Sequence, residues 1–333
     1  MIVLNYNGRR HLNACLESLS AQEVDGGFEV LLVDNASADG SAAHVRRDFP
    51  SVCVIESSTN LGFAGGNNLG IERARGEHLV LLNNDTRVRS GWLRALVEAA
   101  EAAPDVGAVT SKLVFMSHPD TIQNAGSLVL TDGSGGDRGM REPDRGQYDS
   151  REEVFAACGC ATLLTRRMLD DVGLLDSTFF VYYEDTDLSW RMRLRGWRVI
   201  YQPAAVVEHA HAATSGEWSP FFTFHVDRNR LFMILKNAPA GFMLRTFWGY
   251  GVLAGKGAVR AIIRHIRPHS QPSSASSDTT PASRARIHLR VAGSLVAHLP
   301  EMLRKRWRIR RGRKVADAEI MRWLYPRRLW DER

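Results

Sequence analysis

The 333-residue sequence has little of what marks several protein classes. It holds four cysteines, Cys15, Cys53, Cys158 and Cys160, and their spacing fits neither a disulfide framework nor a paired zinc site, so we expect four buried thiols. No apolar run reaches the ~18–20 residues of a membrane-spanning helix, so none is expected. The opening MIVLNYNG has no basic segment followed by a long apolar one, and we therefore expect no secretion signal.

An excess of positive over negative charge is absent from most of the chain and is concentrated at its end. Residues 256–333 carry 19 Lys and Arg against 6 Asp and Glu, whereas residues 1–255 carry 24 against 31. This division argues against a protein that binds nucleic acid along its whole surface. The basic end is also amphipathic and bears Trp, which favours a cytoplasmic protein attached peripherally to the inner face of the cell membrane. A solvated basic helix pair packed on the rest of the protein is the alternative.

Apolar and amphipathic runs alternate over the first hundred residues. The expected strands lie at 2–7, 28–35, 52–57 and 77–85, and the expected helices at 11–22, 39–49, 65–75 and 90–103. This alternation predicts a Rossmann-like, doubly wound α/β domain whose mostly parallel sheet has helices on both faces. Ligands bind such sheets at the carboxyl ends of the strands. The polar residues at those ends are therefore site candidates, namely Asn5, Asp34, Asn83 and Asp85.

The remainder of the chain is less regular. Residues 116–153 are rich in Gly, Asp and Arg and lack periodicity, which predicts a long functional loop region. VFAACGCATLLTRRML, at 154–169, predicts a strand and a helix. The Ser-, Pro- and Thr-rich tract at 268–283 cannot bury a core and predicts a linker. We therefore expect a folded domain at 1–235 and a helical, basic extension at 236–333.

Three carboxylates follow an aromatic run in FFVYYEDTDLSWRMRLRGW, residues 179–197. Acidic residues suit the first turn of a helix, and the residues that follow read as a helix that Gly196 ends. A helix cap accounts for one acid or two and leaves the aromatic approach unexplained. A carboxylate beside aromatic surface is partly desolvated, which raises its proton affinity and suits it to general-base chemistry. The acids Glu184, Asp185 and Asp187 therefore include a candidate for catalysis, and a helix cap stays the alternative.

LLNNDT, residues 81–86, ends the fourth expected strand with two amides and one carboxylate. Asp85 alone would give a metal ion only one protein carboxylate. Mg²⁺ or Mn²⁺, however, often takes one or two protein carboxylates and completes its shell with diphosphate and water. His209, in VVEHAHAAT, would add a nitrogen ligand if the fold brings it close. A purely structural histidine is the alternative.

Two further segments have features of a nucleotide site. The Asp34 carboxylate could accept hydrogen bonds from the N–H groups and ribose hydroxyls of a nucleoside, or it could simply close an Asx-turn. In NLGFAGGNNLGI, residues 60–71, the glycines would let the backbone approach a ligand. This segment is not the dinucleotide fingerprint, which needs G-x-G-x-x-G at the first strand-to-helix turn, where the chain reads NYNGRR.

Taken in order, VLNYNG, VDNASADGS, NLGFAGGNN, LLNNDT, FFVYYEDTDLSWRMRLRGW and VEH resemble glycosyltransferase family 2 over about residues 1–235. This family comprises inverting GT-A nucleotide-sugar transferases. The sequence looks closest to the branch with rhamnosyl- and galactofuranosyltransferases of bacterial cell-envelope polysaccharides. The resemblance implies Asp185 as the catalytic base beside Glu184, with Asp85 and His209 as metal ligands. Nucleotide contacts are expected from Asn5, Asp34, Asn67, Asn68, Asn83 and Asn84.

The expected reaction follows from this resemblance. A metal-dependent enzyme would move a sugar, with rhamnose the first to test, from a dTDP- or UDP-sugar to a hydroxyl of a lipid-linked or polysaccharide acceptor. Asp185 would then have to lie in the same crevice as Asp34 and Asp85. Two alternatives stay open. One is a sugar-phosphate nucleotidyltransferase, although NYNGRRH is a poor phosphate loop; the other is an inactive membrane-associated partner, because Asn83 stands where the family usually has an acid.

Overall fold

The computed structural model describes residues 1–210, 219–266 and 281–331. By contacts the chain divides into two units, one formed by residues 1–211 with 313–333 and the other by residues 212–312. This division differs from the expected boundary at residue 235, because the end of the chain returns to the first unit. Most of the expected linker at 268–283 lies outside the described residues, and its last three residues begin a helix.

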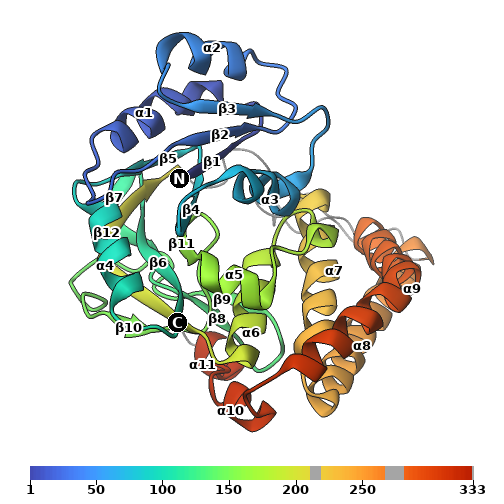
Figure 1. Ribbon diagram of the computed structural model, residues 1–333. Coiled ribbons are helices and arrows are strands. Elements are labelled where there is room, and N and C mark those ends of the chain that lie inside the picture. The colour runs from blue at the N-terminus through green and yellow to red at the C-terminus, as the bar shows by residue number, and fades with distance from the viewer. Residues whose placement is uncertain (211–218, 267–280, 332–333) are drawn as a thin grey trace. The chain divides into compact units, whose positions relative to one another are not determined.

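A mixed, mostly parallel sheet forms the middle layer of the first unit (Figure 1). Its strands and those of a small separate hairpin are β1 (Ile2–Asn5), β2 (Leu31–Asp34), β3 (Cys53–Glu56), β4 (His78–Asn83), β5 (Thr86–Val88), β6 (Val106–Phe115), β7 (His118–Asn124), β8 (Ser127–Val129), β9 (Gly135–Asp137), β10 (Glu152–Glu153), β11 (Ala161–Thr165) and β12 (Arg198–His209). The sheet order is β10-β12-β6-β11-β4-β1-β2-β3. Strands β4, β1, β2 and β3 are parallel, so their carboxyl ends share one edge.

Helices cover both faces of this sheet, as the sequence predicts. In the first unit they are α1 (Arg9–Ser20), α2 (Ser41–Asp48), α3 (Gly62–Arg73), α4 (Trp92–Glu101), α5 (Arg166–Val172), α6 (Glu184–Arg195), α10 (Asp317–Arg322) and α11 (Arg327–Asp331). Val3 and the inward residues of α1, α2 and α4 form one core cluster, whereas Ile2 and those of α3, α5 and α6 form the other. Neighbouring strand residues thus point to opposite layers, which explains why these strands are apolar throughout.

Two predictions about the first unit are wrong. Residues 116–153 are not a loop without regular structure, because they contain β7 to β10. Strands β8 to β10 have only two or three residues each. Strand β7 reads HPDTIQN, with an exposed first half and few apolar residues, so none of the four has the apolar periodicity of a core strand. Cys53 is exposed because β3 is the edge strand, whereas Cys15 and Cys160 are buried and Cys158 is half-buried.

Helix α6 carries the three acids of the aromatic stretch and is buried along most of its length. It begins at Glu184, slightly earlier than predicted, and Gly196 ends it in the left-handed region with φ 88°, as predicted. Leu188 and Met192 pack into the core. The Asp187 side chain is fully buried, and its Oδ2 atom lies 2.9 Å from Nε of Arg191. Asp187 is therefore a structural acid.

The second unit is helical. Its helices are α7 (Pro220–Asn237), α8 (Ala240–Ile266) and α9 (Pro281–Gly312). Leu231, Tyr250, Ile287 and Val291 form its apolar centre. Within the described ranges of the chain, no helix combines the length and the apolarity needed to cross a membrane.

Asp187→Ala should lower the free energy of unfolding by about 3–5 kcal/mol, because the buried Arg191 guanidinium loses its carboxylate. The matched control is Asp317→Ala, which breaks a more exposed i,i+4 pair with Arg313 and should cost less than about 1 kcal/mol. Urea unfolding followed by tryptophan fluorescence measures both. Equal losses in the two variants would contradict a structural role for Asp187.

Candidate active site

The carboxyl ends of β1 and β2 and the residue after β4 carry a connected set of polar side chains. Asn5 and Asp34 are neighbours in the parallel register, and Nδ2 of Asn5 donates to Oδ1 of Asp34 at 2.9 Å. The Asn5 Oδ1 atom accepts from Nδ2 of Asn84 at 2.6 Å. The second Asp34 oxygen accepts from the Ser37 N–H at 3.2 Å. Three of the predicted nucleotide-binding residues thus form one network at this edge.

Gly8 leaves the space that this network occupies. A Cβ atom at Gly8 would lie 1.9 Å from Nδ2 of Asn84 and 2.8 Å from Oδ1 of Asn5. Any larger residue would therefore displace the two asparagines. The glycine of the NYNG motif is explained by this close approach and needs no phosphate loop.

Asp85 and His209 lie together at the same end of the sheet. His209 ends β12 opposite Thr86 of β5, and this pairing brings its Nε2 atom within 3.2 Å of Oδ1 of Asp85. Both side chains are more than nine-tenths buried. Burial alone would raise the pKa of Asp85, but the hydrogen bond and the charge of His209 outweigh it and hold that pKa below its ordinary value.

The Asp85–His209 pair fits a divalent cation. The Oε1 atom of Gln123 lies 3.0 Å from Nδ1 of His209. Where Nδ1–H donates to that oxygen, Nε2 and the carboxylate are two acceptors that face each other, an arrangement that requires a proton or a cation between them. Among the described residues, no group of three or more His, Cys, Asp and Glu could hold a metal. An ion here would therefore take two protein ligands and complete its shell with phosphate and water.

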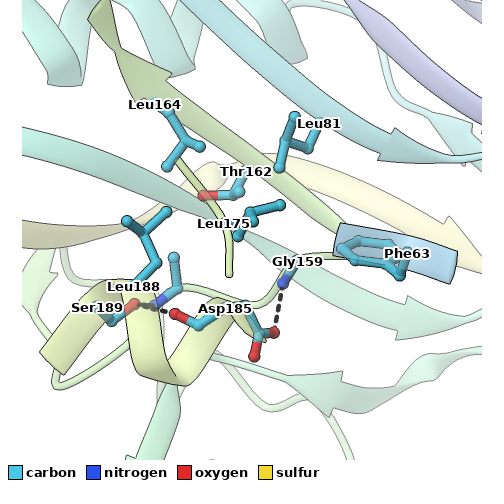
Figure 2. Close-up of a pocket in the computed structure, with 10 residues that line it drawn as sticks. Phe63, Leu81, Gly159, Thr162, Leu164, Leu175, Asp185, Leu188 and Ser189 are labelled. Carbon is cyan, nitrogen blue, oxygen red and sulfur yellow. Dashed lines mark hydrogen bonds between the residues drawn. The ribbon is translucent and has the colours of Figure 1, made fainter. Parts of the chain in front are cut away.

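The Asp185 carboxylate is held at the edge of the sheet by backbone donors. Its Oδ2 atom accepts from the Gly159 N–H at 2.8 Å (Figure 2). Its Oδ1 atom accepts from the Thr186 N–H at 2.6 Å. The turn with Gly159 lies beside the end of β4, because the Asn83 N–H donates to the Cys160 carbonyl at 2.9 Å. The fold thus links Asp185 to the strand that leads into Asp85.

The glycine-rich segment touches the aromatic approach to α6. The N–H groups of Phe63 and Ala64 donate to the Phe180 carbonyl at 2.6 and 3.2 Å. Gly62 has φ +70°, and a Cβ atom there would lie 2.4 Å from that carbonyl oxygen. This contact explains the need for glycine at the start of α3.

The approach to α6 is also strained. Phe180, Tyr182 and Tyr183 all have φ between 66° and 70°, a conformation that costs a non-glycine residue about 1–3 kcal/mol. Such strain persists only where surrounding contacts impose it, and it concentrates at functional sites. The aromatic run is therefore a tightly held turn that sets the direction of the first residues of α6.

Glu184 and Asp185 differ in environment. Glu184 is 4% exposed, and its Oε2 atom has no hydrogen-bond partner among the described residues. Burial and the adjacent Asp185 charge raise the pKa of Glu184 well above its ordinary value. Burial also raises the pKa of Asp185, although the N–H groups of Gly159 and Thr186 stabilise its charged form. Burial therefore favours the protonated form of both carboxyls, and the two backbone donors counteract it at Asp185.

The remaining predicted nucleotide residues are less clearly placed. Asn68 donates to the Leu175 carbonyl at 2.8 Å and accepts from the Leu175 N–H at 3.2 Å, so it ties α3 to the segment before α6. Asn67 is 1% exposed, and its Oδ1 atom has no hydrogen-bond partner within the described part of the chain. The Asn83 carbonyl accepts from Oγ1 of Thr86 at 2.6 Å. Nucleotide contacts stay predictions for these three asparagines, as they do for Asn5, Asp34 and Asn84.

Two residues that orient the candidate groups were missed from the sequence. Gly159 lies in the C-x-C run, where only the thiols attracted attention. A glycine two residues before a buried strand was a signal for close backbone approach. Gln123 lies in the segment predicted to be a loop, and no local pattern pointed to its contact with His209.

Comparison with known proteins identifies the family of the chain. The family model "Glycosyl transferase family 2" matches residues 1–173. An N-acetylglucosaminyl-diphospho-decaprenol L-rhamnosyltransferase of Mycobacterium tuberculosis is 28% identical over 242 residues, which cover 65% of this chain and 77% of that protein. The uncharacterized protein y4gI of Sinorhizobium fredii is 29% identical over 62% of this chain, but the match spans only 24% of its own length.

Solved structures confirm the GT-A fold. A mannosyltransferase of Pyrobaculum calidifontis, in complex with GDP-Man and Mn²⁺, superposes with a TM-score of 0.52 at 16% identity and covers 90% of this chain and 86% of its own. GalNAc-T7, with UDP, GalNAc and Mn²⁺, gives a TM-score of 0.60 at 12% identity, covering 90% of this chain and 56% of its own. At these identities the likeness shows the fold alone. The match of the family model over more than half of the sequence shows that the chain belongs to glycosyl transferase family 2 and is a glycosyltransferase.

Proposed function

We propose that this glycosyltransferase moves a sugar from a dTDP- or UDP-sugar to a hydroxyl of a lipid-linked or polysaccharide acceptor, with inversion at the anomeric carbon. Rhamnose is the first donor sugar to test, because a relative of this chain is named a rhamnosyltransferase with a diphospho-decaprenol acceptor. An O-antigen biosynthesis protein of Myxococcus xanthus is also 29% identical over 61% of this chain, although the match spans 16% of its length. Both relatives support an acceptor of the cell envelope.

The nucleotide would bind at the carboxyl ends of β1, β2 and β4. Asp34 already accepts from Asn5 and from the Ser37 N–H, and a carboxylate offers about four lone-pair sites, so it can still accept from a base or a ribose hydroxyl. Asn84, whose amide donates to Asn5 in the same network, offers a further polar group, and Asn83 ends β4 at the same edge of the sheet. The hydrogen bonds that fix Asn5, Asp34 and Asn84 would reduce the entropy cost of binding.

One observation carries the catalytic assignment: the Gly159 N–H holds the Asp185 carboxylate beside the end of β4, the strand that leads into Asp85. Asp185 would remove the proton of the acceptor hydroxyl as its oxygen attacks the anomeric carbon in line with the departing diphosphate. Burial and the Asp185 charge raise the pKa of the neighbouring Glu184 well above its ordinary value, so Glu184 would keep its proton. Asp185 would then ionise without a second negative charge beside it.

Asp85 and His209 would hold a Mg²⁺ or Mn²⁺ ion. When bound, the ion supplies positive charge that stabilises the departing diphosphate. Gln123 fixes the orientation of the His209 ring through its Nδ1 atom and therefore sets the direction of Nε2. We do not propose Asn83 as a metal ligand, because its backbone carbonyl accepts a hydrogen bond from Thr86 and its side-chain amide is a weaker ligand than a carboxylate.

The second unit would bind the surface of an anionic membrane. On α8 the large apolar side chains of Leu244, Trp248 and Leu253 are 64%, 76% and 59% exposed. On α9 the exposed apolar residues are Leu289, Val296, Leu299, Leu303 and Trp307. Exposed cations such as Lys256, Arg304 and Arg308 lie on the same helices. Apolar side chains next to basic ones match a surface of acidic headgroups above acyl chains, and they would bring the enzyme to a lipid-linked acceptor.

The two alternatives have different standing. Family membership and the packing role of Gly8 favour transfer of a sugar over transfer of a nucleotidyl group. An inactive partner would keep the fold without turnover, and titration calorimetry with a nucleotide sugar and Mn²⁺ separates it from an enzyme when no donor binds.

Asp185→Asn should lower the transfer rate by about 10²–10⁴-fold, because the acceptor hydroxyl loses its general base. Its affinity for nucleoside diphosphate and Mn²⁺ should stay unchanged. The assay measures release of nucleoside diphosphate from dTDP-rhamnose and a panel of UDP-sugars in the presence of a polyprenyl-diphosphate-linked sugar, and NMR of the product gives the anomeric configuration. Asp170→Asn, at an exposed position on α5, is the matched control. Full transfer by Asp185→Asn would refute the base assignment, and a wild type without turnover on any donor would refute the function.

Glu184→Gln should make the protein more stable at neutral pH. The raised pKa means that the folded protein keeps the Glu184 proton while the unfolded chain loses it near the ordinary value of 4.5. The free energy of unfolding of the wild type therefore falls as pH rises from about that value, with an upper slope of about 1.4 kcal/mol per pH unit. Gln cannot titrate, so its advantage should grow between pH 4 and pH 7 in urea unfolding. A difference that does not vary with pH would contradict the raised pKa.

Trp248→Glu combined with Trp307→Glu should reduce binding to anionic vesicles by at least about tenfold, because two large apolar side chains are lost from the contact. Vesicle co-flotation at low and high salt measures this binding, and added salt should weaken the wild type as well. Phe28→Glu, at an exposed aromatic in the first unit, is the control. Equal flotation of wild type and double variant would rule out this membrane surface.

A further inference from the structure

The end of the chain extends the small hairpin of β8 and β9. The Tyr325 N–H donates to the Val129 carbonyl, and the Thr131 N–H donates to the Tyr325 carbonyl, both at 2.9 Å. Leu130 and Tyr325 form a parallel bridge. A segment nearly two hundred residues further along the chain is therefore joined to this hairpin by one isolated β-bridge.

Two side chains of α11 fix the turn of the same hairpin. Nη1 of Arg327 donates to Oδ2 of Asp132 and to Oγ of Ser134, each at 3.3 Å. The Trp330 indole lies against Gly136, where a Cβ atom would come within 2.9 Å of the ring. Only glycine leaves space for the indole there, so the hairpin and the end of the chain are fitted to each other.

The hairpin in turn holds the residue before the two candidate acids. The Gly135 N–H donates to the Tyr183 hydroxyl at 2.8 Å. Tyr183 is the N-cap residue of α6 and has φ 70°. Its carbonyl accepts the first hydrogen bond of the helix, from the Asp187 N–H at 2.8 Å. A shift of the Tyr183 ring would therefore be transmitted directly to the backbone of Glu184 and Asp185.

Residues 313–331 also contact the C-terminal end of α6. The N–H groups of Lys314 and Val315 donate to the Leu194 carbonyl at 2.7 and 3.2 Å, which satisfies a helix terminus. The Trp323 ring lies 3.9 Å from the guanidinium carbon of Arg193. Arg193 is buried on α6 and donates to the Phe155 carbonyl at 2.8 Å. Both ends of the acid-bearing helix are thus tied to residues 313–331.

We propose that residues 313–331 position Asp185 by holding α6 at both ends, with Tyr183 as the positioning residue that links the β8–β9 hairpin to the acids. The inference rests on the proposed role of Asp185 in sugar transfer. Its physical basis is orientation, since a displacement of about 1 Å at a reacting group can cost about 10²-fold in rate. A chain end that lay loosely on the surface would not make a cation–π contact with the buried Arg193. It would also not need a glycine at position 136 to leave space for the Trp330 indole.

Two readouts test this inference on the full-length protein. The first is hydrogen exchange of peptides that cover residues 180–187, which needs no substrate. Arg327→Ala and Trp330→Ala should each accelerate exchange there, and Tyr183→Phe should accelerate it together with exchange at Gly135. The second is the rate of transfer per nucleotide-binding site counted by calorimetry, which should fall about 10–100-fold with KM for the donor within about twofold.

The controls are the exposed neighbours Arg328→Ala and Leu329→Ala on the same helix, which should leave both readouts unchanged. Trp330→Phe should restore most of the transfer lost in Trp330→Ala, because a smaller ring still covers Gly136. If Tyr183→Phe fails to fold, the two α11 variants decide the matter alone. Unchanged exchange at 180–187 in both would overturn the inference, and so would normal transfer by both in an active enzyme. A wild type without transfer would refute the proposed function, while the exchange data would still decide whether residues 313–331 hold α6.

Discussion

The hydrogen bond from the Gly159 N–H to the Asp185 carboxylate is the contact on which the candidate site depends. It joins a helix that starts late in the chain to the edge of the sheet where β1, β2 and β4 end. The polar groups at those ends come from segments far apart in sequence, and only the parallel register brings them together. Asp185 reaches this edge because antiparallel β11 lies between β4 and β6 and places its leading turn there.

The site and the fold constrain each other through close backbone approach. Gly8 leaves space for the Asn5–Asn84 pair, and Gly62 leaves space for the Phe180 carbonyl. The second contact lies in the turn before α6, where three aromatic residues have strained backbone conformations. The cost of that strain is offset by the burial of α6, whose acid Asp187 is satisfied by Arg191. A single helix start therefore combines one structural acid with two carboxyls of perturbed pKa.

Sequence reasoning succeeded where local pattern decides structure. The strands that end at Asn5, Asp34 and Asn83 were predicted because each is an apolar run bounded by polar residues, and parallel packing makes that signal strong. It failed for β7 to β10, because β8 to β10 have two or three residues each and β7 is mostly polar, so neither gives an apolar periodicity. It failed for Cys53 because a strand's place at the edge is a property of topology, not of its own residues. The Gln123–His209 contact depends on the same non-local pairing.

The end of the chain shows the limit of dividing a protein by composition. Its basic residues suggested a single extension from residue 236, yet residues 313–333 belong by contacts to the first unit. Composition indicates which surfaces a segment is suited to contact. The backbone hydrogen bonds of Tyr325 with Val129 and Thr131 show which part of the protein this segment packs on. A helix of twelve residues with its acids at one end gains little rigidity from its own hydrogen bonds. Its direction is set by what holds its two termini. Residues 314 and 315 bond the C-terminal end directly, and the hairpin that residues 325–330 contact bonds the residue before the N-terminal end.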